Sequence, residues 1–232
     1  MISVIIPVYN EEQQIHNTIT QVLKNDLAKL VTEIIVSDGG STDQTVTVAV
    51  QTGATICHSS KKGRAAQMNQ GAAIAKGDLL YFLHADTIPP PGFSSEIMKV
   101  LNQRTKAGCF MLAFDHRHWF LKANSWFTRF NIDAIRFGDQ SLFLTKDVFK
   151  ATGGFNETLI VMEDQEIVKR IRRFSDFVVI KKYVLTSARK YIENGVYKTQ
   201  FVFYLIFFMH RLGYSQEQLV KTYKKLLLQN KI

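Results

Sequence analysis

Four polar segments in the first half of the chain carry side chains suited to binding a charged small molecule. Each follows a short, mainly apolar run, and they span residues 7–12, 38–43, 61–64 and 85–87. Asp86 comes after the apolar residues 79–83, so a buried strand would deliver its carboxylate to the strand end. Divalent cations that serve phosphates are held by one or two carboxylates plus the phosphates. Asp86 is therefore a candidate metal ligand, with a turn aspartate as the alternative.

Asp38 and Arg64 offer complementary chemistry. A carboxylate at a strand end can accept hydrogen bonds from a base N–H or a ribose hydroxyl. The alternative for Asp38 is an Asx-turn or a helix cap, because two glycines follow it. Arg64 follows Lys62 and Gly63 at a predicted helix start, an arrangement typical of phosphate binding. An exposed basic turn is the alternative there.

Apolar patterning predicts the elements that position these groups. Strands are expected at 2–9, 33–37, 54–58 and 79–84, alternating with helices at 11–24, 42–52, 65–76 and 93–102. Ser41 or Thr42 should open the second helix, and Gly77 should cap the third. The alternation predicts an α/β fold with a doubly wound, mostly parallel sheet. Ligands bind such sheets beyond the carboxyl ends of the strands.

The second half is less regular. Strands are expected at 108–114 and 142–145, and helices at 163–174, 196–212 and 216–228. The first of these helices should bury Ile167, Val168 and Ile171. The two cysteines, Cys57 and Cys109, have no metal-ligand spacing, which favours buried, reduced thiols in a cytosolic protein. No signal peptide is expected, and the longest apolar run, 201–209, is too short for a transmembrane helix.

The charge is distributed unevenly along the chain. Residues 1–164 contain 15 Lys and Arg against 16 Asp and Glu, whereas residues 165–232 contain 14 against 4. A basic C-terminal third favours an anionic partner such as a phosphate, a lipid head group or nucleic acid. A solvated basic face is the alternative. Nucleic acid is disfavoured because the basic residues match no recognition motif, and a dehydrogenase is disfavoured because no GxGxxG follows the first strand.

Three segments, in their order and spacing, resemble the family 2 glycosyltransferases of the GT-A fold. They are VIIPVYNEE at 4–12, VSDGGSTD at 36–43 and HADT at 84–87. The Gly63-Arg64-Ala65 turn, with Gln67, Met68 and Asn69 after it, resembles a compact bacterial branch of the family. The resemblance covers roughly residues 1–190.

The resemblance implies a nucleotide-diphosphate sugar donor and a divalent metal, Mn²⁺ or Mg²⁺. Asp86 matches the last aspartate of the family's DxD metal motif. His84 stands at the first position of that motif, where it would be a nitrogen ligand or would pack beneath the site. The donor site implied by the family consists of Pro7, Tyr9, Glu11, Asp38, Arg64, Ala85 and Asp86.

The resemblance also implies the catalytic group. GGFNE at 153–157 and VMED at 161–164 resemble the family's glycine-phenylalanine turn and acidic pair. Inversion by single displacement needs a base opposite the leaving diphosphate. Asp164 is the first choice and Glu163 the second, although both could only complement a helix N-terminus. Asp139 and Gln140 resemble a segment on the acceptor side.

The sequence thus predicts one inverting glycosyltransferase domain with a hydroxyl acceptor. It comprises a nucleotide-sugar-binding half (1–105), an acceptor and catalytic half (106–190) and C-terminal helices (191–232). The alternatives are a polyprenyl-phosphate sugar transferase at the membrane surface and a non-catalytic nucleotide-binding module. Five aromatic residues in 201–209 beside basic residues suit an anionic membrane surface or a lipid-linked acceptor. A core helix or a homodimer interface is the other reading. We expect a cytoplasmic location, with peripheral contact at the inner face of the membrane left open.

Overall fold

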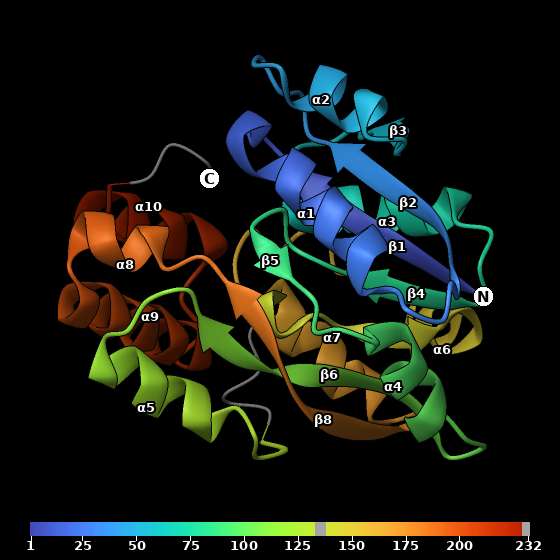
Figure 1. Cartoon of the computed structure of the whole chain (residues 1–232). Coiled ribbons are helices and arrows are strands. Elements are labelled where there is room, and N and C mark those ends of the chain that lie inside the picture. The colour runs from blue at the N-terminus through green and yellow to red at the C-terminus, as the bar shows by residue number, and fades with distance from the viewer. Residues whose placement is uncertain (133–137, 229–232) are drawn as a thin grey trace.

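A computed structural model describes residues 1–132 and 138–228 of the chain (Figure 1). The strands are β1 (Ile2–Val8), β2 (Val31–Asp38), β3 (Thr55–His58), β4 (Leu79–Phe82), β5 (Thr87–Ile88), β6 (Thr105–Phe114), β7 (Phe143–Thr145) and β8 (Asp176–Thr186). The first five helices are α1 (Glu12–Asn25), α2 (Thr45–Gln51), α3 (Arg64–Ile74), α4 (Phe93–Val100) and α5 (Trp119–Phe127). The later ones are α6 (Lys146–Thr152), α7 (Glu163–Ile171), α8 (Arg189–Asn194), α9 (Val196–Arg211) and α10 (Gln216–Leu226). A short 3₁₀ helix, η2, spans Gly138–Gln140.

The strands form one sheet in the order β3-β2-β1-β4-β7-β6-β8-β5. Strands β1, β2, β3 and β4 are parallel to their neighbours in this group, as β6 is to β8, while β7 and β5 pair antiparallel. The α/β fold with a mostly parallel sheet is therefore as predicted. The carboxyl ends of β1, β2 and β4 meet at one edge of the sheet, where the fold places its ligands.

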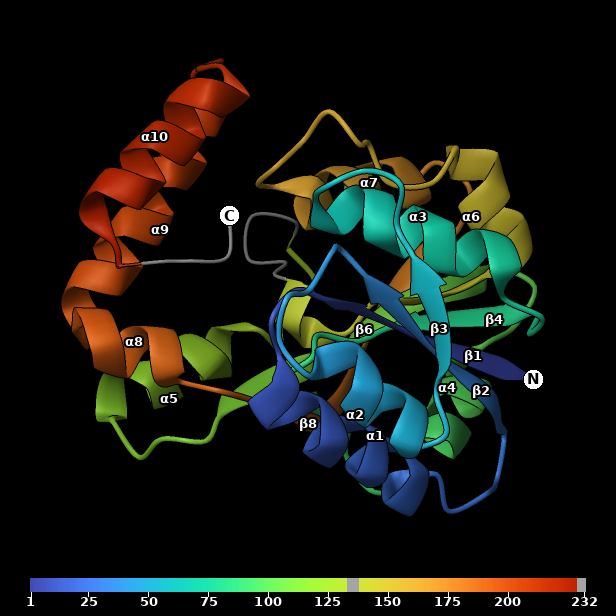
Figure 2. The same ribbon diagram turned by 90° about the horizontal axis from the view of Figure 1, so that it is seen from above.

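Helices cover both faces of the sheet because the buried strand β1 sends alternate side chains to opposite faces (Figure 2). Val4 and Ile6 pack in the apolar cluster beneath α1, α2 and α4. Ile5 packs in the second cluster, beneath α3, α6 and α7. Ile167, Val168 and Ile171 of α7 are buried there, as their spacing predicts.

Two predicted helix ends are wrong. The second helix begins at Thr45, not at Ser41 or Thr42. Ser41 cannot open it because its hydroxyl accepts a hydrogen bond from the backbone N–H of Asn10. Helix α3 ends at Ile74 with Ala75 as its cap, so Gly77 is no cap. Gly77 instead lets the chain pass β1, since a Cβ there would lie 2.8 Å from the backbone oxygen of Met1.

Helices α8, α9 and α10 form a group beside the sheet, together with α5 (Figures 1 and 2). Two small apolar clusters hold the group together, one around Val202, Ile206 and Leu219 and one around Leu121 and Tyr191. None of the helices among the described residues has the length and apolar character needed to span a bilayer. Cys57 and Cys109 are both buried, as predicted, and form no disulfide with each other.

Candidate active site

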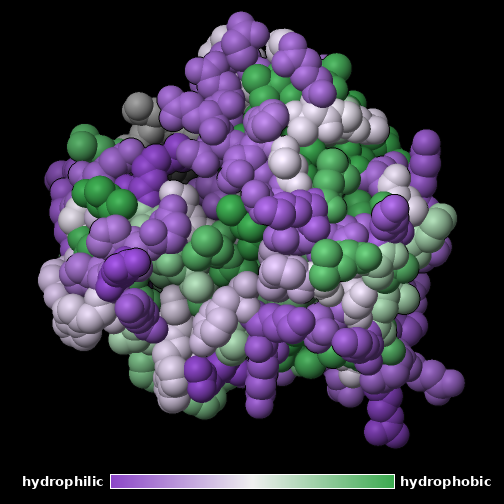
Figure 3. All heavy atoms as spheres, in the orientation of Figure 1, coloured by the Kyte–Doolittle hydropathy of each residue, from purple (hydrophilic) through white to green (hydrophobic). Residues whose placement is uncertain are grey.

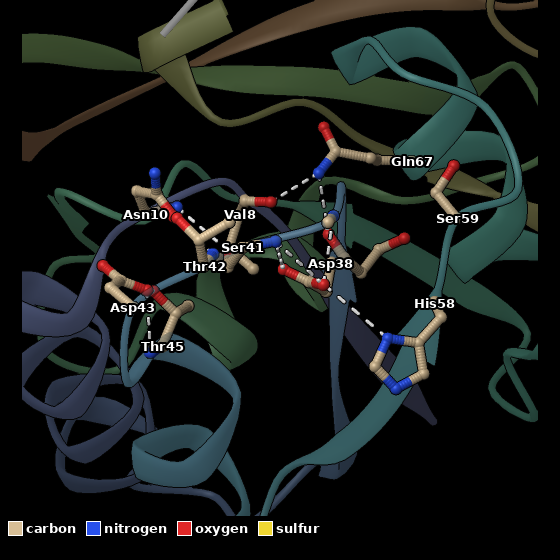
Figure 4. Close-up of polar contacts among 12 residues, drawn as sticks. Val8, Asn10, Asp38, Ser41, Thr42, Asp43, Thr45, His58, Ser59 and Gln67 are labelled. Atoms are coloured by element: carbon tan, nitrogen blue, oxygen red, sulfur yellow. Dashed lines mark hydrogen bonds and ion pairs between the residues drawn. The ribbon is translucent and has the colours of Figure 1, made fainter. Parts of the chain in front are cut away.

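The loops that follow β1 and β2 are hydrogen-bonded to each other (Figure 4). Asn10, with a left-handed backbone (φ 53°), donates its N–H to the Ser41 hydroxyl and accepts from the N–H of Thr42 at 2.8 Å. The N–H of Glu11 donates to the Thr45 hydroxyl at 2.7 Å. The two loops therefore form one preorganised rim at the carboxyl edge of the sheet.

Asp38 lies within this rim and is 3 % exposed. Its carboxylate accepts hydrogen bonds from the backbone N–H groups of Gly40 (3.0 Å) and Ser41 (3.1 Å), and Nδ1 of His58 lies 3.6 Å away (Figure 4). The Asx-turn predicted as the alternative is thus present. The same turn fixes the carboxylate at the strand end. The contact of this carboxylate with a nucleoside stays a prediction. Of the other predicted nucleoside contacts, Pro7 is buried and Tyr9 is exposed.

Gln67 of α3 ties the helix to both strand ends. Its side-chain N–H₂ donates to the backbone oxygens of Val8 (2.6 Å) and Ser37 (3.0 Å) (Figure 4). Gly39 lies against this amide, because a Cβ at Gly39 would be only 2.6 Å from its nitrogen. A glycine is therefore required here for close approach, which gives the second residue of the Asp38-Gly39-Gly40 segment a packing role.

His84, just beyond β4, is bound by a carboxylate from far along the chain. Its Nδ1 lies 2.6 Å from Oδ1 of Asp139 in η2. Burial lowers the pKa of His84, but the hydrogen bond and charge of Asp139 outweigh it and leave that pKa raised. Burial likewise opposes ionisation of Asp139, yet His84 holds the pKa of Asp139 below its usual value. Both shifts favour an imidazolium paired with a carboxylate at this place.

Asp86 lies in a cluster of carboxylates. Burial raises its pKa, and the charges of Asp139 and Glu11 raise it further, while those of His84 and Arg189 lower it. The neighbouring Ala85 is buried and accepts a hydrogen bond from the Thr18 hydroxyl through its backbone oxygen. The backbone N–H of Ser187 donates to the backbone oxygen of Asp86 at 3.2 Å, which brings the end of β8 to the same place.

These hard oxygen donors fit a divalent cation of the Mg²⁺ or Mn²⁺ type. A cation near Asp86 would relieve the repulsion that raises its pKa. Within residues 1–132 and 138–228, no three His, Cys, Asp or Glu side chains are placed to ligate one ion. The site therefore fits a cation held by Asp86 and completed by a ligand's phosphates, rather than an all-protein cage.

Arg64 and Glu163 form an ion pair between the first residues of α3 and α7. Nη2 of Arg64 lies 2.9 Å from Oε1 of Glu163, whose side chain is 1 % exposed. Burial raises the pKa of Glu163 to about 7, although the Arg64 charge opposes this. Asp164 is half-buried, and its charge acts on both Arg64 and His84. The predicted acidic pair thus lies near Arg64 and His84.

The predicted glycine-phenylalanine turn packs against α3. The side chain of Asn69 accepts from the N–H of Phe155 (2.8 Å) and donates to its backbone oxygen (2.9 Å). Gly154 has φ +72°, and a Cβ there would lie 2.7 Å from Oδ1 of Asn69. Asn69 and the turn together fix the entry of the chain into α7, so they position the acidic pair.

The structure separates the two residues predicted on the acceptor side. Asp139 reaches the site, whereas Gln140 is 1 % exposed and donates to the backbone oxygen of Phe110 at 3.1 Å. Gln140 therefore anchors η2 in the core. Sequence reasoning missed Arg189, whose Nη2 lies 3.7 Å from Oε2 of Glu11. Its only signal in the sequence was its share of the basic C-terminal third.

The site thus combines carboxylates and cations from several strand ends and helix starts at one edge of a mostly parallel sheet. A profile described as "Glycosyl transferase family 2" matches residues 3–155. The chain belongs to glycosyl transferase family 2. This confirms the family predicted from the segments at 4–12, 36–43 and 84–87.

Relatives within the family agree with this assignment. An uncharacterized glycosyltransferase of Rickettsia typhi is 26 % identical over 205 residues, which cover 82 % of this chain and 64 % of that protein. Glucosyl-3-phosphoglycerate synthase of Mycolicibacterium smegmatis is 32 % identical over 97 residues, or 38 % of this chain and 32 % of that protein. The chain therefore spans less than two thirds of the length of these relatives.

Solved structures confirm the GT-A fold of this family 2 member. Mannosyltransferase PcManGT of Pyrobaculum calidifontis, in complex with GDP-Man and Mn²⁺, superposes with a TM-score of 0.70 at 15 % identity, covering 91 % of this chain and 63 % of that one. S. aureus TarS 1–349 gives 0.68 at 17 % identity, covering 83 % and 62 %. Glucosyl-3-phosphoglycerate synthase of Mycobacterium tuberculosis, with Mn²⁺, UDP and glucosyl-3-phosphoglycerate, gives 0.63 at 19 %, covering 92 % and 80 %.

Proposed function

We propose that the chain transfers a sugar from a nucleotide-diphosphate sugar to a hydroxyl acceptor with inversion. The observation that carries the proposal is a pair of contacts in a family 2 chain: Arg64 of α3 with Glu163 of α7, and His84 after β4 with Asp139 of η2. The similar structures in complex with GDP-Man and Mn²⁺, with UDP-GlcNAc and with UDP and Mn²⁺ support a donor of this class.

The donor side is assigned to residues 1–105. Pro7, Tyr9, Glu11 and Asp38 would contact the nucleoside, because they lie at the carboxyl ends of β1 and β2 or in the loop after β1. Arg64, Ala85 and Asp86 would face the diphosphate. Asp86 would hold Mn²⁺ or Mg²⁺, which supplies positive charge that stabilises the departing diphosphate. Arg64 supplies a second positive charge for the same diphosphate, since Glu163 holds its guanidinium in place.

The acceptor side is assigned to residues 106–190, and we assign the general base to Asp164. It would take the proton of the acceptor hydroxyl as that oxygen attacks the anomeric carbon and the bond to the diphosphate breaks. Glu163 is the weaker choice because its carboxylate is buried against Arg64. Asp139 would lie beside the acceptor, where its pairing with His84 fixes its orientation.

A polyprenyl-phosphate acceptor is the second candidate, favoured by the exposed aromatic face of α9, one of the C-terminal helices at 191–232. A phosphate oxygen needs no strong base, so this candidate predicts that Asp164→Asn keeps most of its transfer activity. For either acceptor we propose a cytoplasmic location at the inner face of the membrane.

A thermal-shift series tests the donor assignment. UDP and GDP are added with and without Mn²⁺ to the wild type, to Asp86→Asn and to Asp176→Asn, a control carboxylate at the start of β8. We expect one nucleotide to raise the Tm with Mn²⁺, because a ligand at 100 times its Kd adds about 2.7 kcal/mol of stability. Asp86→Asn should lose the Mn²⁺-dependent part, and Asp176→Asn should keep it. A panel in which no nucleotide raises the wild-type Tm would overturn the proposal.

A further inference from the structure

Helices α5 and α9 lie against each other and share an exposed surface. The side-chain N–H₂ of Asn124 donates to Oε1 of Gln200 at 2.9 Å, and the rings of Phe120 and Tyr197 have centroids 5.2 Å apart. Both helices lie at the end of the molecule away from β3 (Figures 1 and 2). We call the outward face of this pair the α5–α9 surface. It consists of Trp119, Lys122, Trp126, Arg129, Tyr197, Phe201, Tyr204, Phe208 and Arg211.

Helix α5 carries both tryptophans of the chain, and both are exposed. Trp119 is 65 % and Trp126 45 % exposed. A spacing of seven residues puts them on one face of the helix, and the exposed Lys122 lies between them. The guanidinium of Arg129 lies 4.5 Å from the centre of the Trp126 ring. Aromatic rings and cations therefore alternate along this face.

Helix α9 is apolar on two opposite faces. Val202 and Ile206 are buried against α10, as expected for a helix that closes a domain. Tyr197, Phe201, Tyr204 and Phe208 follow one another at intervals of four, three and four residues and are all exposed. A helix that is apolar all round is normally enclosed. Among the described residues this second face is covered only in part, by Phe120 at Tyr197, and each of its four side chains is at least 48 % exposed.

The charge of the surface has one sign. Residues 116–132 contain Arg117, Lys122 and Arg129, and residues 194–216 contain Lys198 and Arg211, with no Asp or Glu in either range. On the face shown in Figure 3, hydrophobic and near-neutral residues gather at the lower left, over α5 and α9, with hydrophilic ones between them. A symmetric dimer through this surface would place its cations opposite one another. Tryptophan, tyrosine and lysine instead suit the boundary between anionic head groups and acyl chains.

We infer that the α5–α9 surface docks this protein on an anionic lipid bilayer, with the aromatic rings in the head-group region. The assignment does not depend on which sugar or acceptor the enzyme uses, because it uses none of the residues assigned to the donor or the base. It would hold the enzyme at the membrane without a spanning helix.

Intrinsic fluorescence tests the inference directly, since both tryptophans lie in the proposed contact. The whole chain is titrated with vesicles of phosphatidylglycerol and phosphatidylcholine and with vesicles of phosphatidylcholine alone, and binding is measured in parallel by flotation. We expect a blue shift and co-flotation with the anionic vesicles and much weaker binding to the neutral ones. Lys122→Ala and Arg129→Ala should each weaken binding about fivefold.

Phe201→Ser/Phe208→Ser removes two exposed rings and should weaken binding by at least about tenfold. Leu23→Ser/Leu27→Ser on and just after α1 is the matched control, because both leucines are exposed away from this surface; it should bind normally. Both variants should keep the wild-type Tm and its nucleotide-dependent shift, which separates this test from that of the proposed function. The inference is overturned if the folded wild type does not float with anionic vesicles, or floats without a change in tryptophan fluorescence. It is also overturned if the ring variant dissociates a dimer, or loses RNA binding, while vesicle binding is unchanged.

Discussion

Nδ1 of His84 lies 2.6 Å from Oδ1 of Asp139, a residue 55 positions further along the chain. His84 stands at the position predicted from the resemblance to match the first residue of the family's metal motif, where an aspartate is usual. In this chain η2 brings Asp139 near Asp86 as a further carboxylate, and His84 pairs with it. The site therefore contains an acidic group, Asp139, that lies outside the HADT segment at 84–87.

Asp139→Asn should destabilise the protein by about 1 kcal/mol. The bond is charge-assisted, but Asp139 is 40 % exposed, so solvent screening reduces its contribution. Urea unfolding measures the change, and Asp176→Asn, an exposed carboxylate, should stay within about 0.5 kcal/mol of the wild type. A double variant with His84→Gln should lose less than the sum of the single changes. Additive losses would show that the pair does not interact.

Glu163→Gln should change how stability depends on pH. The pKa of Glu163 is raised to about 7 in the folded protein, chiefly by burial, so the folded state holds a proton that the unfolded state releases near its ordinary pKa of 4.5. The wild type should therefore lose stability as the pH rises from 4.5 to 7, by up to roughly 3 kcal/mol. The Gln variant lacks this titration and should show a flatter profile.

Urea unfolding of both proteins at pH 5 and pH 8 measures the effect. Arg64, Asp164 and His84 act on Glu163 and are present in both proteins, so their own titrations largely cancel in the difference. The stability of the wild type relative to the variant should be lower at pH 8 than at pH 5. Parallel profiles would mean that Glu163 is ionised throughout, with Arg64 outweighing its burial.

The donor half of the fold could be predicted because its strands are buried on both faces. Strands β1, β2 and β4 are nearly continuous apolar runs, and each ends at a polar segment, so both the strands and the site edge were visible in the sequence. Strand β8 was not predicted. Lys181 and Lys182 interrupt its apolar pattern, at the place where its pairing with β6 shifts between Phe110 and Met111.

Helix α5 was missed because large aromatic residues lie on its exposed face. Trp119 and Trp126 are exposed while Leu121 is buried, so the segment shows no amphipathic period. The contacts of His84 with Asp139 and of Arg64 with Glu163 have no local signal, since each joins residues far apart in the chain. Individual site residues could be named from motifs, but their pairing could not.

Asp164→Asn should lower kcat by at least about a hundredfold if the acceptor is a hydroxyl, because general-base catalysis contributes a factor of this size. The dissociation constant of the nucleoside diphosphate, measured by calorimetry, should change little. Glu166→Gln is the matched control in the same helical turn, since Glu166 is paired with Arg170 and not with the site. A variant that transfers sugar at the wild-type rate would exclude Asp164 as the base.

Gly39→Ala should destabilise the rim of the donor site by about 1–3 kcal/mol, the usual cost of overpacking a filled interior. A Cβ at this position would lie 2.6 Å from Nε2 of Gln67, whose amide binds the backbone oxygens of Val8 and Ser37. The amide cannot retreat without giving up its hydrogen bonds to those oxygens. Thermal and urea unfolding would measure the loss, and nucleotide affinity should fall with it. Because Gln67→Ala removes the clash, Gly39→Ala should lower the free energy of unfolding by less in the Gln67→Ala background. An equal loss in both backgrounds would mean that the contact with Gln67 is not the cause.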